Sequence, residues 1–252
     1  MDLSKVALQS RSLCPDSAEF KTKWNLTLNP SNLSKYDFFL NDESGFWQLR
    51  TRTGQQFEIN FDQNKMDYQR KNVSKKNILA KAIGLKTKGL CVLDLTAGLA
   101  IDAVHLTQLG CKITSLERNP VLHFLLSQAQ KKSSRAEIKN IDFLLADAGH
   151  FLLEQGQMIA EKFDVIYYDP MFPEKKKSAL PRKEMQVFRQ LVGEDADTKD
   201  VIDASLQTRV KRFVVKRPLR STLEKKVDPN VSVITYKGNT VQYQAYLQGT
   251  KK

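Results

Sequence analysis

The pattern of apolar and polar positions changes near residue 70 of the chain. From Leu90 onward, short apolar runs of strand length alternate with longer stretches of helical periodicity. The first predicted strand begins at Leu90, and the next four span 112–116, 141–146, 163–168 and 212–216. Helices are predicted after the first strand through Gly110, after the third through Gln155, and over 183–191 and 199–210. This alternation predicts an α/β fold with a mostly parallel sheet.

The last apolar segments follow a different rule. Residues 231–236 and 240–247 have strand composition and flank the turn Lys237-Gly238-Asn239. A tight turn between two strands predicts a hairpin, so we expect one antiparallel edge at the C-terminal side of the sheet.

Residues 1–70 do not share the alternation and are predicted to form a small α/β region, with the main domain over 71–252. Residues 46–52 and 56–61 alternate apolar with polar around Thr53-Gly54, which predicts a hairpin. A helical stretch over 67–83 joins the two parts. Trp47, Phe57 and Phe61 are interpreted as core residues, the alternative being a stacking platform for RNA.

The turn after the first strand, Asp94-Leu95-Thr96-Ala97-Gly98-Leu99-Ala100, has the composition of a nucleoside site. Gly98 lets a ligand approach the backbone, and the following helix presents free N–H groups there. Glu117, at the end of the second strand, is placed to bond ribose hydroxyls. A dinucleotide would need a glycine-rich turn, whereas a single glycine beside acids suits a cation such as S-adenosylmethionine.

The predicted fourth strand ends at Asp169-Pro170-Met171-Phe172-Pro173. Asp169 can accept a hydrogen bond from an exocyclic amine of a nucleobase, Pro170 fixes the backbone so that a carbonyl accepts a second, and Phe172 offers a stacking face. The alternative is an ordinary Asp-Pro turn. Together with the upstream turn and Glu117, the motif favours methyl transfer to an amine.

Charge indicates the class of substrate. The 252 residues carry 40 Lys plus Arg against 28 acids, a net charge of +12, and positive residues gather at 174–183, 211–212 and 216–220. This favours a nucleic acid partner over a small metabolite, although a solvated surface is the alternative. The three cysteines lack metal spacing and the three histidines form no metal motif. No membrane span or signal peptide is predicted, and we expect a cytoplasmic protein without a metal.

Several of these motifs together resemble the ribosomal RNA small subunit methyltransferase J family. The resemblance rests on Asp94–Ala103, Leu116-Glu117-Arg118-Asn119-Pro120-Val121, the Asp169 motif, Lys176-Lys177-Ser178-Ala179-Leu180, Lys183-Glu184-Met185 and Val214-Val215-Lys216-Arg217-Pro218. It is close over about 70–225. It implies a class I, Rossmann-like methyltransferase that uses S-adenosylmethionine to methylate the exocyclic N2 of one guanine in 16S rRNA.

The resemblance also implies site residues. The cofactor contacts of the family correspond to Ile101, Asp102, Glu117, Arg118, Asp147, Ala148 and Asp169. Ile101 stands where an arginine is usual, and Asp147-Ala148 replaces a pair of serines, so the side-chain roles at 101 and 148 are the least determined.

The full hypothesis assigns three groups of residues. The cofactor set adds Asp94 and Gly98 to those seven positions, and the base is held by Asp169, Pro170 and Phe172. The residues expected to contact RNA are Lys175, Lys176, Lys177, Arg182, Lys183, Lys216 and Arg217. The expected partner is 16S rRNA or the 30S subunit. Two rival hypotheses stay open: an adenine-N6 DNA methyltransferase, and an rRNA-binding assembly factor without catalysis. The target nucleotide and the oligomeric state stay open as well.

Overall fold

The chain forms two compact units in the computed structural model, which describes residues 2–42, 45–62, 77–86, 89–171, 183–193, 195–219, 221 and 228–249. The first unit comprises Met1–Phe61, Phe124–Ser133 and Pro173–Glu194. The second comprises Asp62–His123, Ser134–Phe172 and Asp195–Lys252. The first unit therefore draws on three separate stretches of sequence. The division of the chain into folding domains at residue 70 stays a prediction.

The first unit contains a mixed five-stranded sheet in the order β2-β1-β3-β4-β5. Its strands are β1 (Val6–Gln9), β2 (Thr27–Leu28), β3 (Phe38–Asn41), β4 (Gln48–Thr51) and β5 (Gln56–Glu58). Strand β1 pairs in parallel with β2 and β3, whereas β3, β4 and β5 pair antiparallel. The predicted hairpin is confirmed, because Leu49 of β4 lies opposite Phe57 of β5. Its helical segments are η1 (Leu3–Lys5), α1 (Pro15–Lys23), η2 (Leu33–Lys35) and α9 (Lys183–Val192).

Aromatic side chains form much of the core of the first unit. Phe20 stacks on Phe124 with ring centroids 4.4 Å apart, and Trp47 meets the same ring edge-on at 5.1 Å. Phe57 packs edge-on against Phe188 at 6.5 Å. Trp47, Phe57 and Phe61 are all buried, which confirms the core interpretation over the stacking platform.

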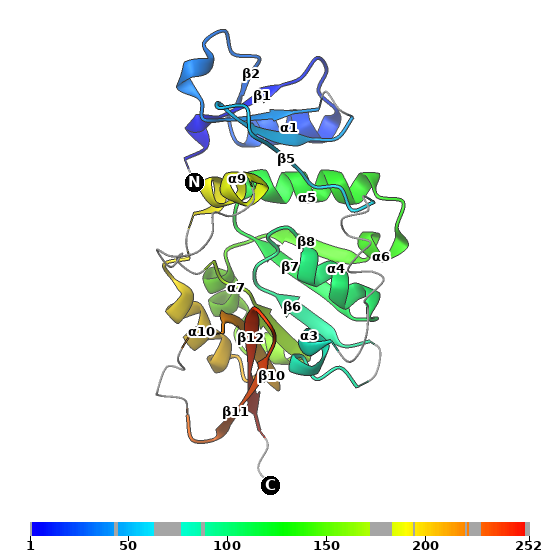
Figure 1. Ribbon diagram of the computed structural model, residues 1–252, viewed down its shortest axis with the longest axis vertical. Helices are drawn as coiled ribbons and strands as arrows, with labels where there is room; N and C mark the ends of the chain where they lie inside the picture. Colours follow the sequence, from blue (N-terminus) through cyan, green and yellow to red (C-terminus); the bar gives the residue numbers. More distant parts are fainter. Residues whose placement is uncertain are drawn as a thin grey trace. The chain divides into compact units, whose positions relative to one another are not determined.

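The second unit is built on a seven-stranded sheet in the order β11-β12-β10-β9-β6-β7-β8 (Figure 1). Its strands are β6 (Cys91–Asp94), β7 (Lys112–Glu117), β8 (Ile141–Leu145), β9 (Val165–Tyr168), β10 (Arg212–Pro218), β11 (Val231–Lys237) and β12 (Val241–Gln248). Strands β8, β7, β6, β9 and β10 are parallel, whereas β12 is antiparallel to β10 and β11. This confirms the predicted parallel sheet with an antiparallel C-terminal edge. Strand β10 is two residues longer than predicted because it pairs with β12 as far as Pro218.

Helices accompany both faces of this sheet. Their bounds are α3 (Ile78–Ala82), α4 (Ile101–Gln108), α6 (Ala136–Lys139), α7 (Ala148–Gln155), α8 (Met158–Lys162) and α10 (Thr198–Gln207), while α5 (Pro120–Lys132) begins in this unit. Residues of α7, α8 and α10 share a buried core with alternate residues of β9 and β10. Figure 1 shows α7 and α10 on one side of the sheet and α3 and α4 on the other. Only 78–82 of the helix predicted over 67–83 is described as helix, because 63–76 lie outside the described residues.

The sheet brings polar residues from distant parts of the sequence to one edge. Asp94, Glu117 and Asp169 end or follow the parallel strands β6, β7 and β9. The carboxyl ends of parallel strands meet at one edge, where α/β proteins bind their ligands. No helix among the described residues is long and apolar enough to cross a membrane.

Candidate active site

The turn after β6 is held in place by a buried carboxylate. Asp94 is 2% exposed, and it accepts hydrogen bonds from the Ser115 hydroxyl at 2.6 Å and from the backbone N–H of Thr96 at 3.1 Å. Burial raises the pKa of Asp94 to about 7, against the lowering effect of these two bonds. Asp94 thus holds the backbone of the turn at Thr96. Its contact with a cofactor stays a prediction.

The turn itself has left-handed backbone at two positions. Gly98 has φ +52° and Ala100, the N-cap of α4, has φ +56°. Glycine adopts this conformation readily, whereas alanine does so at a cost, so the turn is held by its surroundings. The backbone N–H of Ala97 donates to the Leu116 carbonyl at 2.7 Å. The turn is therefore bonded directly to the end of β7.

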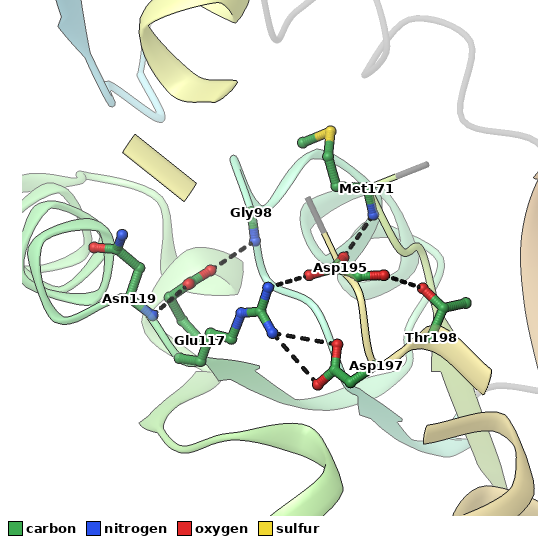
Figure 2. Close-up of polar contacts among 8 residues, drawn as sticks. Gly98, Glu117, Asn119, Met171, Asp195, Asp197 and Thr198 are labelled. Atoms are coloured by element: carbon green, nitrogen blue, oxygen red, sulfur yellow. Dashed lines mark hydrogen bonds and ion pairs between the residues drawn. The ribbon is translucent and has the colours of Figure 1, made fainter. Parts of the chain in front are cut away.

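Glu117 joins this turn to the loop that follows β7. Figure 2 shows Glu117 between Gly98 and Asn119, whose backbone N–H groups donate to Oε2 at 3.2 Å and to Oε1 at 2.8 Å. Burial raises the pKa of Glu117 to about 7. Each carboxylate oxygen has a second lone pair, so the predicted bonds to ribose hydroxyls are compatible with both amide contacts.

Asp195 is a site residue that the sequence analysis did not identify. Its carboxylate accepts from the backbone N–H of Met171 at 2.6 Å and forms an ion pair with Arg118. Thr198 donates to its backbone carbonyl at 2.8 Å, as Figure 2 shows. Arg118 also contacts Asp197 at 3.4 Å. The segment before α10 is thus connected both to the loop after β7 and to the Asp169 motif.

Asp169 lies in a cluster of charged and phenolic groups. Its Oδ2 accepts from Lys216 Nζ at 2.8 Å, and the same ammonium donates to Asp102 Oδ2 at 2.9 Å. The Tyr167 hydroxyl also donates to Asp102, at 2.6 Å. The backbone N–H of Asp169 donates to the Thr96 hydroxyl at 2.9 Å. This last bond joins the Asp169 motif to the turn after β6.

Burial and opposite charge shift the pKa values of Asp169 and Lys216 in opposing directions. Burial raises the pKa of Asp169 to about 6, although the ammonium of Lys216 acts to lower it. Burial acts to lower the pKa of Lys216, but Asp102 and Asp169 together raise it above its ordinary value. The two carboxylates therefore favour the charged form of Lys216.

Other predicted cofactor residues lie near the starts of α4 and α7. Ile101 is the first residue of α4 and is 39% exposed. Asp147 caps α7, where its Oδ1 accepts from the His150 backbone N–H at 3.0 Å, and the adjacent Ala148 is buried. Pro170 is buried directly after Asp169. The contacts of these residues with a cofactor or a base stay predictions.

The predicted RNA contacts are only partly described. Phe172, Lys175, Lys176, Lys177 and Arg182 lie outside the described residues, as does the side chain of Lys183 at the start of α9. Lys216 forms the ion pairs given above. Arg217 is 7% exposed, and its buried Nε has no hydrogen-bond partner in the described structure. Within the described ranges, no group of three or more His, Cys, Asp and Glu is arranged to hold a metal ion.

Similarity to known proteins identifies the family. A family model described as a putative SAM-dependent methyltransferase matches residues 19–248. Ribosomal RNA small subunit methyltransferase J of Bdellovibrio bacteriovorus is 40% identical over 223 residues, covering 88% of this chain and 86% of that one. The Marinobacter nauticus protein of the same name is 36% identical, covering 91% and 84%. This chain belongs to the ribosomal RNA small subunit methyltransferase J family.

Membership of this family agrees with the fold. A SAM-dependent methyltransferase from Neisseria gonorrhoeae has a crystal structure that matches 98% of this chain and 97% of its own, with a TM-score of 0.72 and 22% identity. That likeness concerns the fold alone, which is the class I methyltransferase fold predicted from the sequence. The resemblance to the J family is likewise confirmed.

Two features of this family member carried weak signals in the sequence. Asp195 and Asp197 lie in the acidic segment Gly193-Glu194-Asp195-Ala196-Asp197, between two predicted helices. This segment matches none of the functional motifs considered above. Lys216 stands among other basic residues, so its pairing with two acids could be found only from the register of β10 beside β9.

Proposed function

We propose that this protein transfers the methyl group of S-adenosylmethionine to the exocyclic N2 of one guanine in 16S rRNA. Family membership gives the coarser statement, which is S-adenosylmethionine-dependent methylation of ribosomal RNA. The observation that carries the finer proposal is the 2.9 Å bond from the Asp169 backbone to Thr96. It brings an acceptor suited to an amine next to the turn suited to the cofactor.

The residues at this edge of the sheet fit the cofactor chemically. S-adenosylmethionine supplies an electrophilic methyl group on a sulfonium, together with an ammonium and a ribose. Asp94, Asp102, Glu117 and Asp169 give the site more negative than positive charge, with Lys216 as the cation they surround. A cationic ligand is favoured there, and Glu117 would hold its ribose.

Asp169 would act on the guanine. Its Oδ1 is free of the Lys216 bond, which involves Oδ2, and can accept one N–H of the amine. Such a bond orients the nitrogen lone pair, and most of the rate enhancement would come from this alignment. Methylation makes the nitrogen acidic, so its proton can pass to the Asp169 carboxylate or to water without a strong base.

The basic residues would hold the RNA. Lys175, Lys176, Lys177, Arg182 and Lys183 follow the motif in sequence and are proposed to contact phosphates. Arg217 is proposed to contact the target nucleotide, because the buried Nε of its guanidinium has no acceptor in the described structure and could donate to guanine or to a phosphate. The proposed location is the cytoplasm, and the proposed substrate is 16S rRNA, alone or in the 30S subunit.

Replacement of Asp169 tests the proposal. We expect Asp169→Ala to lower methyl transfer to 16S rRNA by several orders of magnitude while the protein stays folded, because the alignment of the amine is lost. Asp169→Asn keeps an acceptor oxygen, so part of the activity should survive. The measurement is mass spectrometry of 16S rRNA after incubation with 30S subunits, which also identifies the modified atom.

A matched control is Asp203→Ala, because Asp203 is an exposed acid on α10 that pairs only with Lys199 in the described structure. Parental activity in a folded Asp169→Ala variant would show that the Asp169 motif is an ordinary turn without a role in catalysis. Methyl groups found on DNA adenine, and none on rRNA, would support the rival substrate.

A further inference from the structure

Lys216 occupies an unusual position for a lysine of this protein. Its side chain is 23% exposed, whereas Lys131 and Lys199, which also form ion pairs, are 59% and 67% exposed. A largely buried ammonium is costly unless it is paired and hydrogen-bonded. Lys216 meets this requirement through two carboxylates, at 2.8 and 2.9 Å.

The two carboxylates come from different parts of the site. Asp102 lies in the first turn of α4, directly after the turn that suits the cofactor, and Asp169 lies after β9 in the motif that suits the base. Lys216 reaches both from β10, where it lies opposite Tyr243 of β12 and one residue beyond the Val215–Tyr168 pair of β10 and β9. One ammonium therefore links the two halves of the site.

We propose that Lys216 is a positioning residue, whose ammonium orients the Asp169 carboxylate toward the target amine and ties it to Asp102 beside the cofactor. The proposal rests on the proposed function of Asp169. It differs from the sequence-based interpretation of Lys216 as an RNA contact, because the donors of the ammonium are directed at two acids within the protein.

The charge of Lys216 has a second effect on Asp169. Among the described residues, the ionisable groups that influence Asp169 include Lys216 of β10, Asp102 of α4, Asp195 before α10, Asp94 of β6, Tyr167 of β9 and Tyr243 of β12. Lys216 is the cation in this set. Burial and the neighbouring acids raise the pKa of Asp169, and the ammonium opposes them.

Removal of the ammonium therefore changes the pH at which Asp169 ionises. An opposite charge at this distance lowers the pKa of a carboxyl by about 1 to 3 pH units, so its loss raises the pKa of Asp169 by a similar amount. A protonated Asp169 donates through one oxygen and loses the orientation that the ammonium imposed. Transfer at neutral pH then falls and partly recovers in alkali.

The decisive experiment compares Lys216→Met with Lys216→Arg and the parent between pH 5.5 and 9.5, measuring kcat and KM on 30S subunits. In Lys216→Met we expect kcat at pH 7 to fall by about 10- to 1000-fold and the acid limb of the profile to move up by about 1 to 3 pH units. Lys216→Arg keeps the charge, so its acid limb should stay near the parental pH while kcat falls moderately. Lys199→Met is the matched control, because Lys199 pairs with an acid on the surface of α10.

Three results would overturn the proposal. The first is a folded Lys216→Met variant with a parental acid limb. The second is a loss confined to rRNA affinity with a salt slope reduced by about one, the signature of a phosphate contact. The third is a pH profile of Lys216→Arg whose acid limb moves up as far as loss of the charge predicts, although this variant keeps the charge. This result can be obtained even if the methionine variant does not fold. A parent that does not methylate guanine N2 would instead contradict the proposed function.

Discussion

Glu117 has a structural role in the protein itself, in addition to its proposed role in binding the cofactor. Its two oxygens accept N–H groups from two different loops, so the turn after β6 and the loop after β7 share one anchor. Buried N–H groups that lose their acceptor carry a cost of about 1 to 3 kcal/mol. A substitution here is therefore expected to change the shape of the turn as well as the proposed bonds to ribose.

We expect Glu117→Ala to weaken S-adenosylmethionine binding about tenfold or more, because ribose acceptors worth on the order of 1 to 3 kcal/mol are lost. Affinity for rRNA should stay nearly parental. Glu117→Gln keeps one acceptor oxygen, so its affinity for S-adenosylmethionine should lie between those of the parent and of Glu117→Ala. Calorimetry measures the effect, with the exposed Glu154→Ala of α7 as control. Unchanged cofactor affinity in Glu117→Ala would remove this residue from the site.

Single residues were predictable from sequence where their role depends on their place at a strand end. Asp94, Glu117 and Asp169 close or follow apolar runs, so their gathering at one edge follows from the parallel sheet. The bonding of Lys216 and Asp195 depends on the register of strands and loops that are distant in sequence. Local composition therefore indicated an RNA contact for Lys216 and nothing for Asp195.

The inner strands β6 and β9 of the second unit were predictable because each is a nearly continuous apolar run, as expected for strands covered on both faces. Element ends were less predictable: α4 ends at Gln108 and α10 at Gln207, short of the expected Gly110 and Val210. Strands β1 and β3 of the first unit were not predicted. They pair in parallel, with Val6 opposite Phe38, so the paired residues are 32 positions apart in the sequence and no turn signal joins them.

The first unit gives a prediction about its later segments. Phe124 of α5 and Phe188 of α9 contact rings of the first 61 residues and are 5% and 4% exposed. A chain reduced to 71–252 loses those partners, so we expect it to expose both rings and to self-associate. Size-exclusion chromatography with calorimetric titration of S-adenosylmethionine checks this. A monomer with parental affinity would instead support two independent domains divided at residue 70.

The whole molecule combines a basic composition with an acidic site. The net charge of +12 attracts a polyanion over long range, whereas the carboxylates at the sheet edge favour a cationic ligand at short range. The two effects serve different partners and respond differently to salt. Screening by salt weakens attraction between exposed charges more than between buried ones.

Buried acids should also make the stability of the free protein depend on pH. The pKa of Asp94 rises from 3.8 to about 7 and that of Glu117 from 4.5 to about 7, because both are buried. Between about pH 4.5 and 7 the folded protein holds protons that the unfolded chain has released, so these groups make stability fall as pH rises. Tm across this range measures the effect, and Asp94→Asn should flatten it. A steeper fall in that variant would contradict the assignment.

The order of strands at the antiparallel edge has a consequence for synthesis. Strand β12 follows β11 in the chain but lies between β11 and β10, so the strand that carries Lys216 has an unpaired edge until β12 has been translated. Tyr243, opposite Lys216, arrives with that same strand. A nascent chain that still lacks β12 can form β6 to β9 yet leaves Lys216 without this neighbour. Full pairing of the strand that carries Lys216 therefore waits for β12.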